Sequence, residues 1–309
     1  MDLSEKFSKG AETHTYQRIG SEYRTDVFLG YSDSGDMSMV IAEFAAPEKV
    51  DSSKLIEAVL TQRVDGKKAL SFNLLDNAYD TMFMVFCKDI IMECEKVDRE
   101  KTISSAINRW NYWKELFGKK KRSLLNKAEI KGLIGELIEL KRYFIPKFGD
   151  HDAIVSWMGP LYGHKDFEVF NTWYEVKTIS ENAIQVEISS LEQLESASGG
   201  HLSIVRVEDT SSTKEGAINL NKMVVDVADS IKNQADLDLF MTRLDNVGYS
   251  MEPDYENYCF LYLGTETYTV DDSFPRMQRS DVATSIINVR YSILIDGISR
   301  FKEEELDER

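Results

Sequence analysis

The chain has 309 residues, of which 42% are hydrophobic and 11% aromatic, a composition typical of a folded globular protein rather than a disordered one. Its 37 basic and 53 acidic side chains give a net charge of −16, which excludes DNA binding through the overall field of the protein. The sequence contains no run of about 18 apolar residues, no basic and apolar leader and no CxxC pair, so we expect a cytoplasmic protein without membrane span, signal peptide or disulfide framework.

The first hundred residues predict a β-rich region with short helices. Apolar runs at 25–31 and 37–44 flank a loop of Ser, Asp and Gly, which is the pattern of a hairpin. The apolar run 81–91 fits a buried strand and a buried helix equally well, because its periodicity matches neither alone.

Two helices are expected next. Residues 102–117 place their apolar side chains on one helical face, so Trp110 and Trp113 are expected in the core rather than on a base-stacking surface. A longer helix is predicted from Ser123 to about residue 145. Glu136 lies at the edge of its apolar stripe, from which a carboxylate can reach a neighbouring sheet, although an ordinary boundary glutamate occupies the same kind of position.

Beyond Pro146 the pattern changes to strands. Strands are expected at about 153–157, 165–170, 173–179 and 183–188, then a short helix opened by a capping box at Ser190 and a strand at 201–207. Two helices at 214–247 and strands at 258–263, 267–270 and 289–295 complete the chain. The predicted class is α/β, with a β-rich N-terminal domain at 1–100, a core at 101–210 and a mixed helical and strand C-terminal region at 211–309.

The segment from Asp166 to Lys177 concentrates ionisable residues. If it forms a hairpin that turns at Asn171-Thr172, opposed residues share a face of the sheet and successive residues alternate between faces. One face then collects Phe167, Val169, Tyr174 and Val176. The other face collects Asp166, Glu168, Glu175 and Lys177. Asn-Thr is a weak two-residue turn, however, and a loop of odd length would break this parity.

In this register Glu168 lies directly opposite Glu175, which is unfavourable unless a positive charge is near. A divalent cation would supply that charge, because Mg²⁺ binds one or two carboxylates together with water and phosphate oxygens. Lys177 on the same face could hold an attacking water, so the face fits phosphodiester hydrolysis. The alternative is a solvent-facing strand surface with an ordinary ion pair.

These elements and residues resemble the PD-(D/E)XK nuclease superfamily. The predicted helix, three strands, helix and strand resemble its restriction-endonuclease-like αβββαβ core, and Asp166 with Glu175-Val176-Lys177 resembles its signature. More narrowly, the chain is similar to a family of stand-alone PD-(D/E)XK proteins of bacteria and archaea. The stretches that carry this similarity are Gly132-Leu133-Ile134-Gly135-Glu136-Leu137, Trp157-Met158-Gly159-Pro160, Asp166-Phe167, Tyr174-Glu175-Val176-Lys177, Gln193-Leu194 and Ser273-Phe274-Pro275-Arg276.

The resemblance implies a role for each matching residue. Asp166 and Glu175 would bind Mg²⁺, or Mn²⁺ in its place, with the carbonyl oxygen of Val176 as a third ligand. Lys177 would orient the water, and Glu136 would support a second metal or the lysine. The products of cleavage would carry a 5′-phosphate and a 3′-hydroxyl.

Two positions depart from the family pattern. Lys165, rather than proline, precedes Asp166. The glutamine-and-tyrosine helix of exonuclease-like relatives is half present, because Ala197 stands four residues after Gln193. Gln193 itself remains a candidate DNA contact.

The strongest basic cluster is a second candidate DNA contact, formed by Lys119, Lys120, Lys121 and Arg122. It ends fourteen residues before Glu136, or about 20 Å along a straight helix. That distance suits contact with backbone phosphates several base pairs from a cut, and a solvated loop between helices is equally compatible with the pattern.

The sequence thus predicts a Mg²⁺-dependent DNA endonuclease of a phage-defence or restriction–modification system. The resemblance implies helicase, ATPase and DNA methyltransferase partners, and a homodimer is a further alternative. A catalytically inactive subunit that keeps the nuclease fold to bind DNA or dock these partners is the main rival. The net charge of −16 favours that rival, whereas the intact acidic and lysine residues oppose it. A third hypothesis is a nuclease that acts on RNA or on branched or modified DNA.

Overall fold

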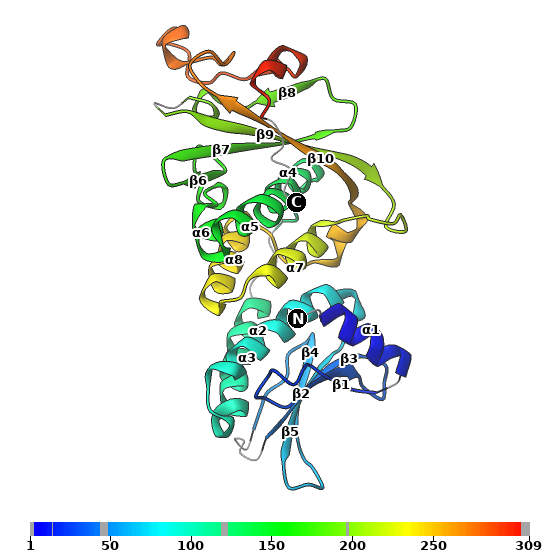
Figure 1. The fold of residues 1–309 in the computed structure, drawn as a ribbon. Coiled ribbons are helices and arrows are strands. Elements are labelled where there is room, and N and C mark those ends of the chain that lie inside the picture. Colours follow the sequence, from blue (N-terminus) through cyan, green and yellow to red (C-terminus); the bar gives the residue numbers. More distant parts are fainter. Residues whose placement is uncertain (1–2, 14, 44–48, 119–122, 196–197, 304–309) are drawn as a thin grey trace. The chain divides into compact units, whose positions relative to one another are not determined.

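The computed structural model describes residues 3–13, 15–43, 49–118, 123–195 and 198–303 (Figure 1). Its backbone divides into two compact units rather than three consecutive regions. The first unit holds residues 1–122, 231–237 and 251–253, and the second holds 123–230, 238–250 and 254–309. The boundaries expected at 100 and 210 differ from this division, because residues 101–118 belong to the first unit and the C-terminal strands to the second.

The first unit contains an antiparallel five-stranded sheet in the order β1-β2-β3-β5-β4. Its strands are β1 (Gln17–Arg18), β2 (Val27–Tyr31), β3 (Met37–Glu43), β4 (Ile56–Gln62) and β5 (Lys68–Leu74). Its helices are α1 (Leu3–Thr13), α2 (Asp80–Lys96) and α3 (Thr102–Gly118). The predicted hairpin is confirmed as β2 and β3, and the ambiguous run 81–91 is helical.

Aromatic side chains from α2, α3 and β5 form the core of this unit. Trp110 is fully buried and Trp113 is 3% exposed, which confirms that both tryptophans are core residues. The ring of Phe86 on α2 lies 5.6 Å from each tryptophan ring, and Phe72 on β5 lies 5.6 Å from Trp110. The helical stripe of α3 therefore serves packing and not base stacking.

The second unit contains a mixed four-stranded sheet in the order β10-β9-β7-β6, in which only β7 and β9 are parallel. Its strands are β6 (Phe167–Val169), β7 (Thr172–Ser180), β9 (Gly200–Thr210) and β10 (Cys259–Val270), and β8 (Gln185–Ile188) pairs separately with β11 (Tyr291–Leu294). Its helices are α4 (Lys127–Glu139), α5 (Ile145–Phe148), α6 (Asp150–Ser156), α7 (Leu220–Ser230) and most of α8 (Gln234–Asn246). The predicted α/β class is confirmed.

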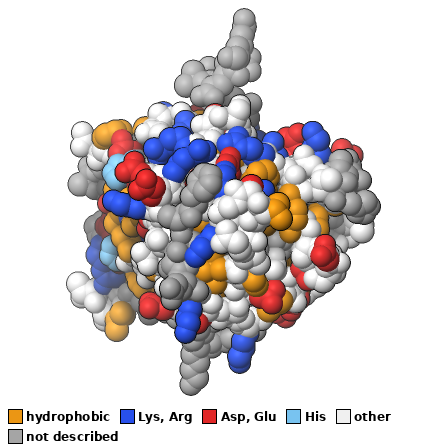
Figure 2. Space-filling model, turned by 90° about the horizontal axis from the view of Figure 1, so that it is seen from below, with side chains coloured by type: hydrophobic (Ala, Val, Ile, Leu, Met, Phe, Trp, Pro, Cys, Tyr) orange, Lys and Arg blue, Asp and Glu red, His pale blue; other side chains and the backbone are white. Residues whose placement is uncertain are grey.

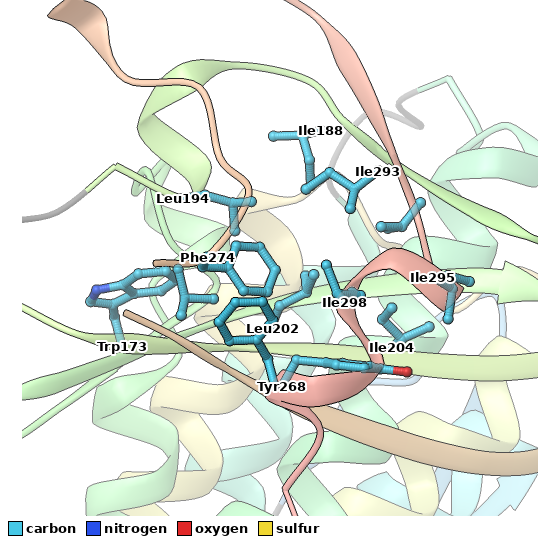
Figure 3. Close-up of a cluster of buried hydrophobic side chains, with 13 residues drawn as sticks. Trp173, Ile188, Leu194, Leu202, Ile204, Tyr268, Phe274, Ile293, Ile295 and Ile298 are labelled. Atoms are coloured by element: carbon cyan, nitrogen blue, oxygen red, sulfur yellow. The ribbon is translucent and has the colours of Figure 1, made fainter. Parts of the chain in front are cut away.

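The two faces of this sheet have different partners. Helices α4 and α7 lie on one side in Figure 1, and β8 lies on the other. On the β8 side, thirteen buried side chains form one hydrophobic cluster, which includes Trp173 from β7, Leu202 from β9 and Tyr268 from β10 (Figure 3). The sheet is therefore covered on both faces, and polar groups can reach solvent only at its edges and ends.

Helix α4 carries Glu136 and begins at a capping box. The side-chain oxygen of Asn126 accepts hydrogen bonds from the N–H groups of Ala128 and Glu129, and the Glu129 carboxylate accepts one from the Asn126 N–H. The predicted start at Ser123 was therefore three residues early. After Glu139 one π-helical turn at Leu140–Phe144 continues into α5.

Four predicted elements differ from the structure. The strand expected at 153–157 is helix α6, because a short apolar run has no strand-specific period and the acidic first turn favours a helix N-terminus. The helix expected at Ser190 is a single 3-10 turn, Leu191–Gln193. The two strands expected at 258–263 and 267–270 are one strand, β10, with a bulge at Gly264, whose φ of +148° suits glycine.

Substitution by alanine should change the stability of the protein in opposite directions at two glycines of α4. A methyl group at Gly132 would meet no atom within 4 Å, so Gly132→Ala should raise the free energy of unfolding by about 0.5–1 kcal/mol. A methyl group at Gly135 would overlap the Thr178 side chain on β7, so Gly135→Ala should lower it by about 1–3 kcal/mol. Urea unfolding of both variants measures the difference; equal stabilities would contradict this close contact between α4 and β7.

The face shown in Figure 2 carries side chains of both charges. On the face shown in Figure 2, Lys and Arg side chains lie among Asp and Glu side chains, with hydrophobic side chains exposed between them. Within the described part of the chain, no helix is both long and apolar enough to cross a bilayer.

Candidate active site

Asp166 is fixed by backbone hydrogen bonds on both sides. It directly precedes β6, and its carbonyl oxygen accepts hydrogen bonds from the N–H groups of Met158 and Gly159 at 2.7 and 3.1 Å. Its side-chain Oδ2 accepts a hydrogen bond from the Val176 N–H on β7 at 2.7 Å. Oδ2 of Asp166 thus links the loop before β6 to β7. The other carboxylate oxygen, Oδ1, takes no part in this hydrogen bond.

Glu175 and Lys177 form an ion pair on β7. Lys177 Nζ lies 2.7 Å from Glu175 Oε1. The Glu175 side chain is 2% exposed and that of Lys177 is 16% exposed. Apart from this pairing, Glu175 Oε1 accepts no well-directed hydrogen bond from the described residues. The lysine ammonium, which is partly exposed, therefore lies against a buried oxygen of the Glu175 carboxyl group.

Glu136 reaches the same place from α4. The Trp157 indole N–H donates to Glu136 Oε2 at 2.7 Å, and Trp157 itself is fully buried. A Cβ at Gly159 would lie 2.8 Å from Glu136 Oε2 and 3.4 Å from Asp166 Oδ1. The missing side chain of Gly159 thus leaves both carboxylates facing one small space.

The cluster disfavours full ionisation. Burial, and then the neighbouring Asp166 carboxylate, raise the pKa of Glu175 to about 8 despite the Lys177 ammonium. Burial and the charge of Asp166 also raise the pKa of Glu136 well above its ordinary value. Burial raises the pKa of Asp166 as well, although Lys177 opposes it. The single ammonium group of Lys177 does not neutralise three carboxylates, so the cluster has an excess of negative charge when all three are ionised.

Comparison with known families decides the assignment. The model of the family described as "Putative PD-(D/E)XK family member, (DUF4420)" matches residues 3–296. The chain belongs to this family. Its α/β fold is accordingly the restriction-endonuclease-like one that the sequence predicted, and the PD-(D/E)XK resemblance is confirmed. No curated protein and no solved structure matches the chain.

PD-(D/E)XK nucleases generally use divalent metals, and the residues present fit one. Asp166 and Glu175 offer hard oxygen ligands, and the cation would relieve the excess of negative charge. The N–H and C=O of one strand residue point to the same edge, so the Val176 carbonyl faces the Asp166 side of β7 as its N–H does. No three His, Cys, Asp or Glu side chains form a ready metal cage in the described ranges, so the fit rests on these two carboxylates and a carbonyl.

The predicted hairpin register was wrong by two residues. The observed partners are Phe167 with Tyr174, Glu168 with Trp173 and Val169 with Thr172, so the turn falls at Phe170-Asn171. A shift of two preserves the alternation of faces, which is why the ionisable residues still separate from the apolar ones. Glu168 nevertheless lies opposite Trp173, is exposed and does not face Glu175.

Lys165 is a site neighbour that the sequence did not reveal. Its side chain is buried over the Trp173 ring, with Nζ 3.8 Å from the ring centroid, and burial lowers its pKa to about 8. Nζ donates to the carbonyl oxygens of Glu192 and Glu195 at 2.6 and 3.2 Å. Lys165 directly precedes Asp166, and its ammonium therefore links this part of the site to the segment after β8. Its partners lie some thirty positions away, so no local pattern could predict this.

Arg276, from the C-terminal part of the chain, also binds a backbone carbonyl group of the segment after β8. Its side chain is 4% exposed, and Nη1 donates to the Leu194 carbonyl oxygen at 2.6 Å. The family-like stretches Gln193-Leu194 and Ser273-Phe274-Pro275-Arg276 therefore meet in space. Gln193 uses its side-chain oxygen to accept the Ser189 N–H at 2.7 Å, and a DNA contact by this residue stays a prediction.

The basic cluster of Lys119, Lys120, Lys121 and Arg122 lies outside the described residues. Its role as a DNA contact also stays a prediction. The described structure brings together Glu136, Asp166, Glu175 and Lys177, which is the full set of catalytic candidates.

Metal binding should release protons from this cluster. Because burial and the neighbouring Asp166 raise the pKa of Glu175 to about 8, a cation that binds the carboxylates should displace protons from the cluster, and its apparent affinity should rise as the pH approaches 8. Titration calorimetry with Mg²⁺ or Mn²⁺ in two buffers of different ionisation enthalpy measures this release. Glu175→Gln should abolish it and Glu168→Gln should not; release unchanged in Glu175→Gln would show that the cation binds elsewhere.

Proposed function

We propose that this protein is a metal-dependent endonuclease that hydrolyses DNA phosphodiester bonds in a phage-defence or restriction system. The observation that carries the proposal is the convergence of Asp166, Glu175 and Lys177 with Glu136, which comes from a separate helix. Membership of the PD-(D/E)XK family supports a nuclease-like activity for this cluster.

Each residue has a distinct part in the proposed reaction. Asp166 and Glu175 would hold Mg²⁺ with the Val176 carbonyl, and the bound cation would neutralise charge developing on the phosphate and make its water more acidic. Lys177, whose ammonium borders the buried Glu175, would donate a hydrogen bond to the attacking water and orient it toward phosphorus. Glu136, held by the Trp157 indole, would complete the acidic side of the same space.

A plasmid assay tests the proposal. Purified protein should nick or linearise supercoiled DNA with Mg²⁺ or Mn²⁺ and fail to do so with EDTA. Asp166→Asn should remove the activity, because this side chain both offers a metal ligand and holds the Val176 N–H. Cleavage that persists in EDTA or in Asp166→Asn would contradict the proposal.

The second candidate is a non-catalytic subunit that binds DNA or docks partner proteins. The net charge of −16 favours it, because a chain of this charge gains little from general attraction to phosphates. Helicase, ATPase and methyltransferase proteins of the same system would be such partners in the cytoplasm. If the protein is the nuclease itself, a homodimer would be the simplest arrangement for cutting both strands. Mg²⁺ binding without any DNA cleavage, alone or with those partners, would favour this candidate.

A further inference from the structure

The loop between α6 and β6 presents an exposed aromatic side chain beside the carboxylate cluster. Tyr162 is 87% exposed, and the four residues from Leu161 to His164 are all exposed. Leu161 and Val155 add two further exposed apolar side chains, at 47% and 44%. Binding residues are found disproportionately on surface loops that a rigid scaffold positions.

The backbone at Tyr162 is one that a tyrosine seldom adopts. Tyr162 has φ +59° and ψ +31°, the left-handed conformation in which a helical turn usually ends with glycine or asparagine. Glycine would suit the backbone at this position better, so backbone geometry does not explain why a tyrosine stands here. Burial of the ring does not compensate for this backbone strain, because the side chain is exposed.

The loop is tied rigidly to the site. The Tyr162 N–H donates to the Gly159 carbonyl at 3.0 Å, and Gly159 and Met158 donate to the Asp166 carbonyl. The Tyr162 hydroxyl donates to the Asn246 carbonyl at 3.4 Å, which fixes one end of the ring and leaves its face open. The Tyr162 backbone is therefore hydrogen-bonded to Gly159, the residue whose Cβ position adjoins the Glu136 and Asp166 carboxylates.

Base stacking is the chemistry that such a ring supports. An open aromatic face stacks on a nucleobase with little dependence on its identity, but only where the base is not already stacked in a duplex. Stacking does not depend on positive charge, which matters for a chain with a net charge of −16. A single strand presents unstacked bases directly, whereas a duplex must be opened first.

We infer that Tyr162 is a base-stacking contact and that the DNA at this site is bound as a single strand next to the cut. The inference rests on the proposed nuclease function and adds its substrate class. Tyr162 acts in binding and takes no part in the bond-breaking step.

Phe170 provides a matched control. It is 83% exposed and has φ +51°, but it lies at the turn after β6, at the opposite end of that strand from Asp166. Four residues of extended chain separate the two positions by about 13 Å. Glycine suits the backbone at both sites, which offsets the loss of the Tyr162 hydrogen bond to Asn246 and of the Phe170 ring contact with Phe148, and a thermal melt checks that both variants remain folded.

The test is a binding measurement in the Lys177→Met background with Mg²⁺, in which the DNA should stay intact. Fluorescence anisotropy compares a labelled single-stranded oligonucleotide with its duplex, and 2-aminopurine quenching reports stacking. Tyr162→Gly should weaken single-strand binding about tenfold and abolish the quenching, and Tyr162→Phe should preserve both. Phe170→Gly should change neither.

Equal single-strand binding by Tyr162→Gly and its parent, preference for the duplex, or no binding of either DNA would overturn the inference. A failure of the proposed nuclease function would give a different result. The wild-type protein would then leave both DNAs uncut with Mg²⁺, while the binding difference between Tyr162→Gly and its parent would persist.

Discussion

Replacement of Lys177 by methionine should lower the single-turnover rate of DNA cleavage by about 10²–10³-fold, the range found when one charge-stabilising donor is removed from an active site. Methionine keeps most of the length of the side chain and removes the ammonium that lies 2.7 Å from Glu175. Lys165, the other lysine next to the cluster in the described part of the chain, does not replace that donor, because two carbonyl groups and the Trp173 ring hold its ammonium.

Lys131→Met is the matched control. Lys131 belongs to α4 and its Nζ donates to Ser180 Oγ at 2.8 Å, outside the carboxylate cluster. Its cleavage rate should stay within about threefold of wild type, as expected for a surface substitution away from the reacting groups. A Lys177→Met rate close to that of Lys131→Met would remove the lysine from the mechanism, and a thermal melt of each variant checks that both remain folded.

Gly159→Ala should reduce metal affinity and cleavage by about 10–100-fold, the usual penalty for disturbing groups that orient metal ligands. The new methyl group would lie 2.8 Å from Glu136 Oε2 and 3.4 Å from Asp166 Oδ1, so at least the Glu136 carboxylate must move. Mn²⁺ binding by calorimetry and cleavage by single turnover, both measured against the wild-type protein, report the two effects separately.

Gly132→Ala serves as the control for the added methyl group. It places the same atom on α4, where no atom lies within 4 Å, and should leave metal binding and cleavage unchanged. Unaltered metal affinity in Gly159→Ala would mean that the space beside Gly159 is not where the cation binds.

The alternation of residues predicted the candidate site better than the turn did. Glu175 and Lys177 share a face of β7 in any register, because side chains alternate with a period of two, and a register shifted by an even number also keeps the ionisable residues of the neighbouring strand on that face. The turn itself was misplaced, because Phe170 adopts a left-handed conformation that no rule for bulky aromatic residues would suggest. The pairing of Glu168 with Glu175, which first suggested a cation, was therefore wrong even though the cluster exists.

Glu136 could be predicted because helical periodicity is a strong signal over a helix of this length. Its partner Trp157 could not, because the segment before it was predicted as a strand and is helix α6. Lys165 and Arg276 illustrate a different limit. Both are buried cations that bind backbone carbonyls of residues 192–195, and such contacts arise only from tertiary folding.

The division of the chain was also beyond local patterns. Residues 231–237 and 251–253 return to the first unit although their neighbours belong to the second. Gln234, at the start of α8, donates to the buried Asp89 carboxylate of α2 at 2.8 Å. A contact between residues so far apart in the chain has no signature in composition or periodicity, so local patterns favour consecutive regions.

The most direct test of the account is the fate of the attacking water. DNA cleavage by the wild-type protein with Mg²⁺ in H₂¹⁸O, followed by mass spectrometry of the products, should place one ¹⁸O atom in a 5′-phosphate and leave a 3′-hydroxyl. The same reaction with Glu175→Gln should give no labelled product. Products with a 3′-phosphate, products without ¹⁸O, or labelling unchanged by Glu175→Gln would contradict metal-dependent hydrolysis at the cluster of Glu136, Asp166, Glu175 and Lys177.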